Sequence, residues 1–228
     1  MNETPRAPEM KRDSDPRSSE PVPADGVRVA LLDYGAGNLH SLAKGLEAGG
    51  ARVTVTTDWD QALGLDALVL PGVGSFGAAV RALEGEEDRV RDALAGGLPC
   101  LGICLGMQLL FSESEEGEGR GIGLIPGRVR RLRARTVPQM GWNDVEPTEA
   151  GTRDPLLAGL AELTAYYANS FVCDPEDTTS VIAETEYEEE RFASAVRKGR
   201  SWGVQFHPEK SSTPGLALLR NFLDEVGR

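Results

Sequence analysis

Short apolar runs alternate with helical segments along the first half of this chain, and this alternation restricts the fold more than any other feature. The apolar runs have the length of buried strands and lie at 27–34, 52–58, 67–70 and 99–104. Helical segments are predicted between and after them, near 38–48, 78–83, 87–95 and 105–111. Because parallel strands need a crossover connection, this order predicts a parallel sheet with helices on both faces.

From residue 128 onward the pattern changes to short β-rich runs. They lie at 128–133, 165–173, 180–186, 192–197 and 202–207. These runs predict antiparallel strands added to the parallel core. Thr213 and Pro214 suit the N-cap and first position of a closing helix that ends at Val226. The predicted fold class is therefore α/β, with a central, mostly parallel sheet, flanking helices and added antiparallel strands.

The first 26 residues have a different composition from the rest. They hold five of the 14 prolines, four basic and six acidic residues, and few apolar side chains. Such a segment cannot bury enough surface to offset the entropy of ordering it. The sequence therefore predicts a disordered tail at 1–26 and one domain at 27–228.

Charge and cysteine content exclude several classes of protein. The formal net charge of −12 disfavours binding to nucleic acid or to an anionic membrane surface. No apolar run reaches the roughly 18 residues of a membrane span. Three cysteines cannot all pair within one chain, so we expect free thiols and a reducing cytoplasm.

Two glycine-rich loops follow predicted strands, at 33–38 and 72–77. The second spells G-x-G-x-x-G, the pattern of dinucleotide-binding turns. It follows the third strand instead of the first, and the next strand does not end in the acidic residue that would bind a ribose. We therefore expect no nicotinamide or flavin cofactor. Tight strand-to-helix turns are the plainer interpretation of both loops.

Gly102-Ile-Cys104-Leu-Gly106 has the spacing of a nucleophile elbow between a strand and a helix. Glycines leave room for a strained backbone at Cys104, and a helix N-terminus there would favour the reactive thiolate. The N–H of Leu105 would point to a developing oxyanion. The alternative is a small buried residue between packing glycines. Cys100 and Cys173 are expected to be inert core thiols.

His207 and Glu209 follow the last β-rich run. In an extended chain, residues two apart share a face, so Glu209 can orient His207 as the base of a triad with Cys104. The alternative is a surface histidine beside a surface glutamate. His40, the other histidine, is expected to be structural or interfacial. No set of cysteines and histidines has the spacing of a metal site, so no metal is expected.

The strings Gly-Ile-Cys-Leu-Gly-Met-Gln (102–108) and Gln-Phe-His-Pro-Glu (205–209) resemble those of the class I, triad-type glutamine amidotransferases. The order Cys, His, Glu matches that family and differs from α/β-hydrolases. The strings at 33–39, 71–76 and 138–143, with Lys210-Ser211, resemble the glutaminase subunits of imidazole glycerol phosphate synthases. The resemblance covers 27–228. It departs at Asn169-Ser170-Phe171, where that family usually has a His-Ser-Tyr-like string.

The resemblance implies hydrolysis of glutamine to glutamate and ammonia by Cys104, His207 and Glu209. It implies an oxyanion hole formed by backbone N–H groups of Leu105 and of the 71–74 segment, at Val73 or Gly72. Gln108 would help to position the glutamine. The region of Ser170 and Phe171 would also hold substrate, although the substitution of the usual string puts side-chain contacts there in doubt.

The resemblance also implies a partner, a cyclase subunit with a β/α-barrel fold, which receives ammonia through a closed channel. That subunit makes imidazole glycerol phosphate, for histidine biosynthesis, and an aminoimidazole carboxamide ribonucleotide. Asn38, Trp142 and Lys210 match positions that face the partner. Five arginines at 128–135 would suit docking to an acidic patch, but a strand with solvated arginines is the preferred interpretation.

Three other functions remain open. The chain could serve a different synthase, such as one for anthranilate or guanylate, although the strings at 33–38 and 138–143 argue against it. It could be a catalytically inactive regulatory module on the same fold, although all three triad residues are present. It could be a cysteine peptidase or thioesterase, which the expected glutamine pocket disfavours.

Overall fold

A computed structural model of the chain describes residues 26–35, 39–72, 74–160 and 162–228. The tail predicted at 1–26 lies outside these ranges except for Gly26 and stays a prediction. Asn38 and Val73 also lie outside them.

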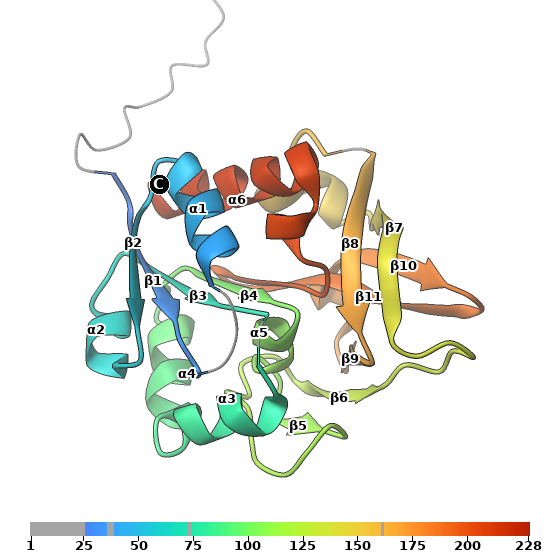
Figure 1. Cartoon of the computed structure of the whole chain (residues 1–228), viewed down its shortest axis with the longest axis horizontal. Helices are drawn as coiled ribbons and strands as arrows, with labels where there is room; N and C mark the ends of the chain where they lie inside the picture. Colours follow the sequence, from blue (N-terminus) through green and yellow to red (C-terminus); the bar gives the residue numbers. More distant parts are fainter. Residues whose placement is uncertain (1–25, 36–38, 73, 161) are drawn as a thin grey trace, which may run out of the picture.

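A mixed sheet runs through the molecule in the strand order β2-β1-β3-β4-β12-β11-β10-β7-β8 (Figure 1). Its first part is parallel throughout. The parallel strands are β1 (Arg28–Leu32), β2 (Arg52–Thr56), β3 (Ala67–Leu70), β4 (Cys100–Ile103) and β12 (Ser201–Val204). The chain's last strand thus lies beside β4, the strand that leads into the cysteine elbow.

The second part of the sheet is antiparallel, as predicted. Its strands are β6 (Gly127–Arg131), β7 (Gln139–Pro147), β8 (Leu163–Asn169), β9 (Phe171–Pro175), β10 (Val181–Tyr187) and β11 (Glu190–Lys198). The short β5 (Glu113–Ser114) pairs with β6 in parallel, and β6 pairs with β9 in antiparallel orientation. The predicted α/β class is confirmed.

Helices cover both faces of the parallel part (Figure 1). The helices are α1 (His40–Ala48), α2 (Trp59–Leu63), α3 (Phe76–Leu83), α4 (Glu87–Ala95), α5 (Leu105–Gln108) and α6 (Ser212–Val226). Short 3₁₀ helices lie at Gly151–Arg153, Pro155–Leu157, Thr178–Ser180 and Pro208–Lys210.

Alternate side chains of β1 point into two separate cores. Val29 and Leu31 belong to the cluster that contains buried residues of α1 and α6. Ala30 and Leu32 belong to the cluster that contains buried residues of α2, α3 and α4. Two-sided burial explains why the central strands are continuous apolar runs.

The single run predicted at 165–173 is wrong, because Ser170 separates β8 from β9 and the two strands pair with different neighbours. Strand β7 is missing from the prediction because its sequence shows little apolar alternation and only two of its nine residues, Gln139 and Val145, are buried. Helix α2 is also missing, since five residues are too few to show a helical period.

Three predicted boundaries need correction. The helix predicted at 105–111 ends at Gln108, and the strand predicted at 202–207 ends at Val204. The closing helix begins at Ser212, with Ser211 in the N-cap position expected for Thr213. Pro214 therefore lies within the first helical turn, where its missing N–H is still tolerated.

Candidate active site

Cys104 lies in a sharp turn between β4 and α5. Its backbone has φ 47° and ψ −103°, a strained conformation for a residue with a side chain. The turn is tightly packed: a Cβ on Gly102 would lie 2.5 Å from the Gly106 carbonyl oxygen, and a Cβ on Gly106 would lie 2.0 Å from that of Leu70. These flanking positions therefore require glycine, and the geometry is that of a nucleophile elbow.

His207 and Glu209 form a buried hydrogen-bonded pair. Nδ1 of His207 lies 2.8 Å from Oε1 of Glu209, and the two side chains are 4% and 7% exposed. His207 itself is extended, but Glu209 lies in the 3₁₀ helix Pro208–Lys210. The predicted pair is thus present, but a turn creates it, so the prediction that both residues lie in an extended chain is wrong.

Gly72 shows how close the imidazole of His207 is to Cys104. A Cβ on Gly72 would lie 2.9 Å from Cε1 of His207 and 3.0 Å from Cβ of Cys104. Burial disfavours the charged imidazole, but hydrogen bonds to Cys104 and Glu209 outweigh burial and raise the pKa of His207 to about 9. At neutral pH this arrangement favours an imidazolium beside the cysteine sulfur, which suits nucleophilic catalysis.

The backbone of His207 is fixed by contacts with β8. Its N–H donates to the carbonyl oxygen of Tyr166 at 2.8 Å. The Ser211 hydroxyl donates to the carbonyl oxygen of His207 at 2.6 Å and accepts from the N–H of Tyr166 at 2.9 Å. These three hydrogen bonds therefore hold strand β8 and the segment that carries His207 in a fixed position relative to each other.

Gln108 and Phe171, two of the residues expected to bind substrate, lie together. The side-chain amide of Gln108 donates to the carbonyl oxygen of Phe171 at 3.3 Å, and that of Asn169 donates to the same oxygen at 3.1 Å. The carbonyl oxygen of Ser170 accepts instead from the N–H of Leu132 at 2.9 Å. The helix after Cys104 is thus tied to the segment where the sequence departs from the family pattern.

Trp142 and Lys210, two of the residues expected to face a partner, meet at one aromatic ring. Trp142 makes an edge contact with Tyr166, with ring centroids 6.2 Å apart, and Nζ of Lys210 lies 5.7 Å from the Tyr166 centroid. Trp142 is 54% exposed and Met140, on the same strand, is 67% exposed. Asn38 lies outside the described residues.

The remaining two cysteines lie in the core as expected, and the expectation that His40 is structural or interfacial stays a prediction. Cys100 and Cys173 are buried, and burial raises the pKa of both thiols. His40 is exposed at the start of α1. Within the arginine-rich stretch, Arg130 departs from the preferred interpretation of solvated side chains. It is buried and pairs with Glu190 at 2.5 Å.

Sequence reasoning missed three polar residues of this site. Tyr166 and Ser211 fix the backbone of His207, and the side chain of Gln205 donates to Sγ of Cys104 at 3.4 Å. The sequence holds a signal for Gln205, because in the strand predicted at 202–207 it lies two residues before His207 and would share its face. Tyr166 gave no such signal, since its role depends on strand pairing that the sequence does not reveal.

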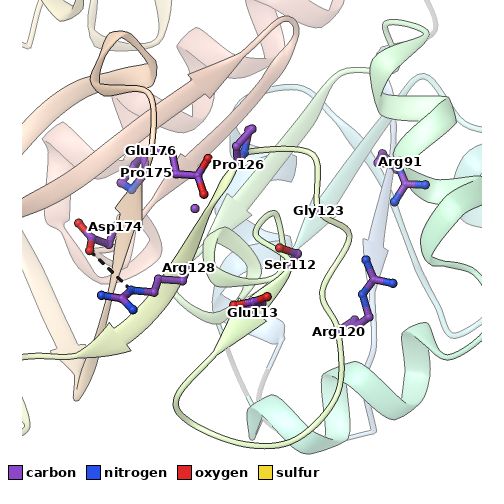
Figure 2. A pocket seen from close by; sticks show the side chains of 11 residues that line it. Arg91, Ser112, Glu113, Arg120, Gly123, Pro126, Arg128, Asp174, Pro175 and Glu176 are labelled. Carbon is purple, nitrogen blue, oxygen red and sulfur yellow. Dashed lines mark ion pairs between the residues drawn. The ribbon is translucent and has the colours of Figure 1, made fainter.

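A separate cavity of about 670 Å³ lies between β6, the end of β9 and the loop near Gly123 (Figure 2). Arginines and carboxylates share its lining, and Arg128 forms a long ion pair with Asp174 at 3.9 Å. None of the residues expected to be functional lines it.

Among the described residues, no group of three or more His, Cys, Asp or Glu side chains is placed to hold a metal ion. Likewise, no helix in the described ranges is long and apolar enough to cross a membrane.

Comparisons with known proteins agree with this geometry. The family model for class I glutamine amidotransferases matches residues 30–226. A subunit HisH of imidazole glycerol phosphate synthase from Synechococcus sp. (strain JA-3-3Ab) is 42% identical over 208 residues, which cover 89% of this chain and 95% of the relative. The HisH subunit from Halobacterium salinarum is 44% identical and covers 87% and 94%. The structure of PurLQS from Thermotoga maritima superposes with a TM-score of 0.70 at 19% identity, covering 88% of this chain and 99% of that one.

Proposed function

The chain belongs to the class I glutamine amidotransferases, and within them to the HisH subunits of imidazole glycerol phosphate synthase, and from this premise we propose that Cys104, His207 and Glu209 carry out its glutaminase reaction. The observation that carries the assignment is the convergence of the three side chains. His207 bonds to Glu209 at 2.8 Å, and a Cβ placed on Gly72 would lie 2.9 Å from Cε1 of His207 and 3.0 Å from Cβ of Cys104.

In the first step, Sγ of Cys104 attacks the side-chain carboxamide carbon of glutamine. The C–N bond breaks as His207 donates a proton to the leaving nitrogen, which departs as ammonia and leaves a thioester. A water molecule then attacks the thioester, with His207 accepting its proton, and glutamate is released as the sulfur regains its starting state. Glu209 orients the imidazole through Nδ1, which leaves Nε2 to exchange protons.

The oxyanion of each tetrahedral intermediate is stabilised by backbone N–H groups. The N–H of Leu105 is suited to this, because the first N–H groups of a helix have no intrahelical acceptor. The second donor is the N–H of Val73 or of Gly72, in the 71–74 segment. Loss of one such donor lowers the rate by roughly 100- to 1,000-fold, so a peptide rotation in this glycine-rich segment would switch the enzyme.

Glutamine is held beside the elbow by Gln108 and by the Ser170–Phe171 segment. The carbonyl oxygen of Phe171 already accepts two amide donors. These two contacts fix Gln108 to the segment, and we propose that backbone groups of the segment other than this carbonyl bind glutamine, since they do not depend on the side chains that differ from the usual string.

The partner is a cyclase subunit with a β/α-barrel fold that takes up the ammonia before water protonates it. Trp142 and Lys210, grouped around Tyr166, are the proposed contact surface, and Asn38 is proposed to join them. Free thiols at all three cysteines suit a reducing cytoplasm, which we propose as the location. We propose no cofactor for the glutaminase step.

The function is tested by co-purifying the chain with its cyclase and assaying glutaminase activity with and without the cyclase's nucleotide ligand. Cys104→Ala should abolish glutamine-dependent synthesis and leave synthesis from added ammonium salts, because the partner performs the cyclisation. Loss of both activities would indicate a structural role for Cys104. Retained glutamine-dependent synthesis would rule out Cys104 as the nucleophile.

A further inference from the structure

The side chain of Gln205 is directed at the sulfur of Cys104. Gln205 lies between the end of β12 and His207 and has no exposed surface. Its Nε2 donates to Sγ of Cys104 at 3.4 Å. The thiol therefore has an amide contact in addition to the imidazole of His207.

Backbone hydrogen bonds hold both partners of this contact in place. The N–H of Gln205 donates to the carbonyl oxygen of Ser194 on β11 at 2.8 Å. The N–H of Cys104 donates to the carbonyl oxygen of Val204, the residue before Gln205, at 2.7 Å. The amide is thus presented to the sulfur by the sheet and does not depend on a mobile loop.

The chemistry of the contact favours one form of the sulfur. An amide N–H only donates, and a thiolate is a far better acceptor than a thiol. We propose that Gln205 is a second polar partner of the nucleophile, which stabilises the Cys104 thiolate together with the imidazolium of His207. This inference rests on the proposed role of Cys104 as the nucleophile.

The other end of the amide supports this role. Oε1 of Gln205 is buried and has no hydrogen-bond partner among the described residues. Burying an unpaired amide oxygen costs free energy, and filling the same space would need only an apolar side chain such as methionine. A hydrogen bond to a charged sulfur offsets part of that cost, whereas packing alone does not.

The test is the rate at which iodoacetamide alkylates Cys104 in the full-length chain, followed by peptide mass mapping as a function of pH. Gln205→Met keeps the length of the side chain and removes the donor. We expect alkylation at neutral pH to slow roughly 10- to 100-fold and the pH profile to move to higher pH, as for the loss of a hydrogen bond to a charged group. Glutamine turnover with the cyclase should lose kcat with little change in KM.

Gln139→Met is the matched control. Gln139 is also a buried glutamine whose amide has no described partner, but no hydrogen bond joins it to the sulfur. It should leave the alkylation profile of Cys104 unchanged. If Gln205→Met lowers the melting temperature by more than a few degrees, Gln205→Leu provides the second comparison. The thiolate of Cys104 is then followed by its ultraviolet absorbance, with Cys104→Ser as the blank.

Wild-type alkylation rates and profiles in folded Gln205 variants would overturn the proposal for Gln205 and leave the triad intact. A wild-type chain in which Cys104 resists alkylation at every pH, even with the cyclase and its ligand bound, would instead overturn the proposed glutaminase function. The two failures are therefore distinguishable in one data set.

Discussion

A methyl group on Gly72 would lie 2.9 Å from Cε1 of His207. The same methyl would lie 3.0 Å from Cβ of Cys104 and 3.0 Å from the carbonyl oxygen of Ile103. The side chains of the cysteine and the histidine thus occupy the volume that any larger residue would need. This loop requires glycine because of the site it borders, whatever backbone conformation it adopts.

Gly72→Ala should therefore impair catalysis by displacing the imidazole. We expect glutamine-dependent turnover to fall at least 100-fold, the order seen when a catalytic group is misplaced by about 1 Å. Gly77→Ala is the control, because its Cβ would meet only the end of the Arg81 side chain, at 3.4 Å. In helix α3 this alanine should raise the free energy of unfolding by about 0.5–1 kcal/mol and spare activity. Equal turnover in the two variants would contradict the prediction.

The backbone of Cys104 predicts an unusual order of stability among its variants. At φ 47° a Cβ is strained, so Cys104→Gly should be more stable than Cys104→Ala by about 1–2 kcal/mol in urea unfolding. Cys100 lies in the regular strand β4, only four residues earlier. There the order should reverse, with Cys100→Gly less stable than Cys100→Ala by about 0.5–1 kcal/mol. The same order at both positions would argue against strain at the elbow.

The raised pKa of His207 predicts a pH-dependent stability. A group whose pKa is higher in the folded state contributes stability that is complete below its unfolded value and is lost as pH rises through its folded value. For His207 this loss extends from about pH 6.5 to about pH 9. The free energy of unfolding should therefore fall across that range by up to about 3 kcal/mol more in the wild type than in His207→Gln. Identical pH slopes for the two proteins would show that His207 is not held as the imidazolium.

The parts of this fold that the sequence predicts well are those with a strong local pattern. Strand β3 has the predicted bounds, because its four apolar residues are followed directly by Pro71 and Gly72, which end the strand. The spacing of its glycines predicts the elbow, because a side chain at either glycine would clash, as a Cβ on Gly106 would with the carbonyl oxygen of Leu70. Strand β7 has no regular apolar alternation in its sequence, and only its pairing with β8 and β10 makes it a strand.

In the candidate site too, features with a local sequence pattern are predicted and features that depend on tertiary contacts are not. The identities of Cys104, His207 and Glu209 follow from local strings, but the turn that brings Glu209 to His207 does not, since Pro208 permits both an extended chain and a 3₁₀ helix. Tyr166 is connected to His207 only through the pairing of distant segments, 41 residues apart in the chain. Contacts of this kind depend on the tertiary fold and produce no periodic pattern in the sequence.

Trp142 is predicted to matter for assembly more than for folding. More than half of its surface is exposed, so Trp142→Ala should change the free energy of unfolding by less than about 1 kcal/mol. A tryptophan that becomes buried at an interface is commonly worth about 2 kcal/mol or more, so the dissociation constant for the cyclase should rise roughly 30-fold or more, as measured by titration calorimetry. Val55→Ala is the control, because Val55 is 49% exposed on β2, at the opposite edge of the sheet from β7 and β8. It should leave binding unchanged. If Trp142→Ala binds the cyclase as tightly as Val55→Ala does, the surface around Tyr166 is not the contact.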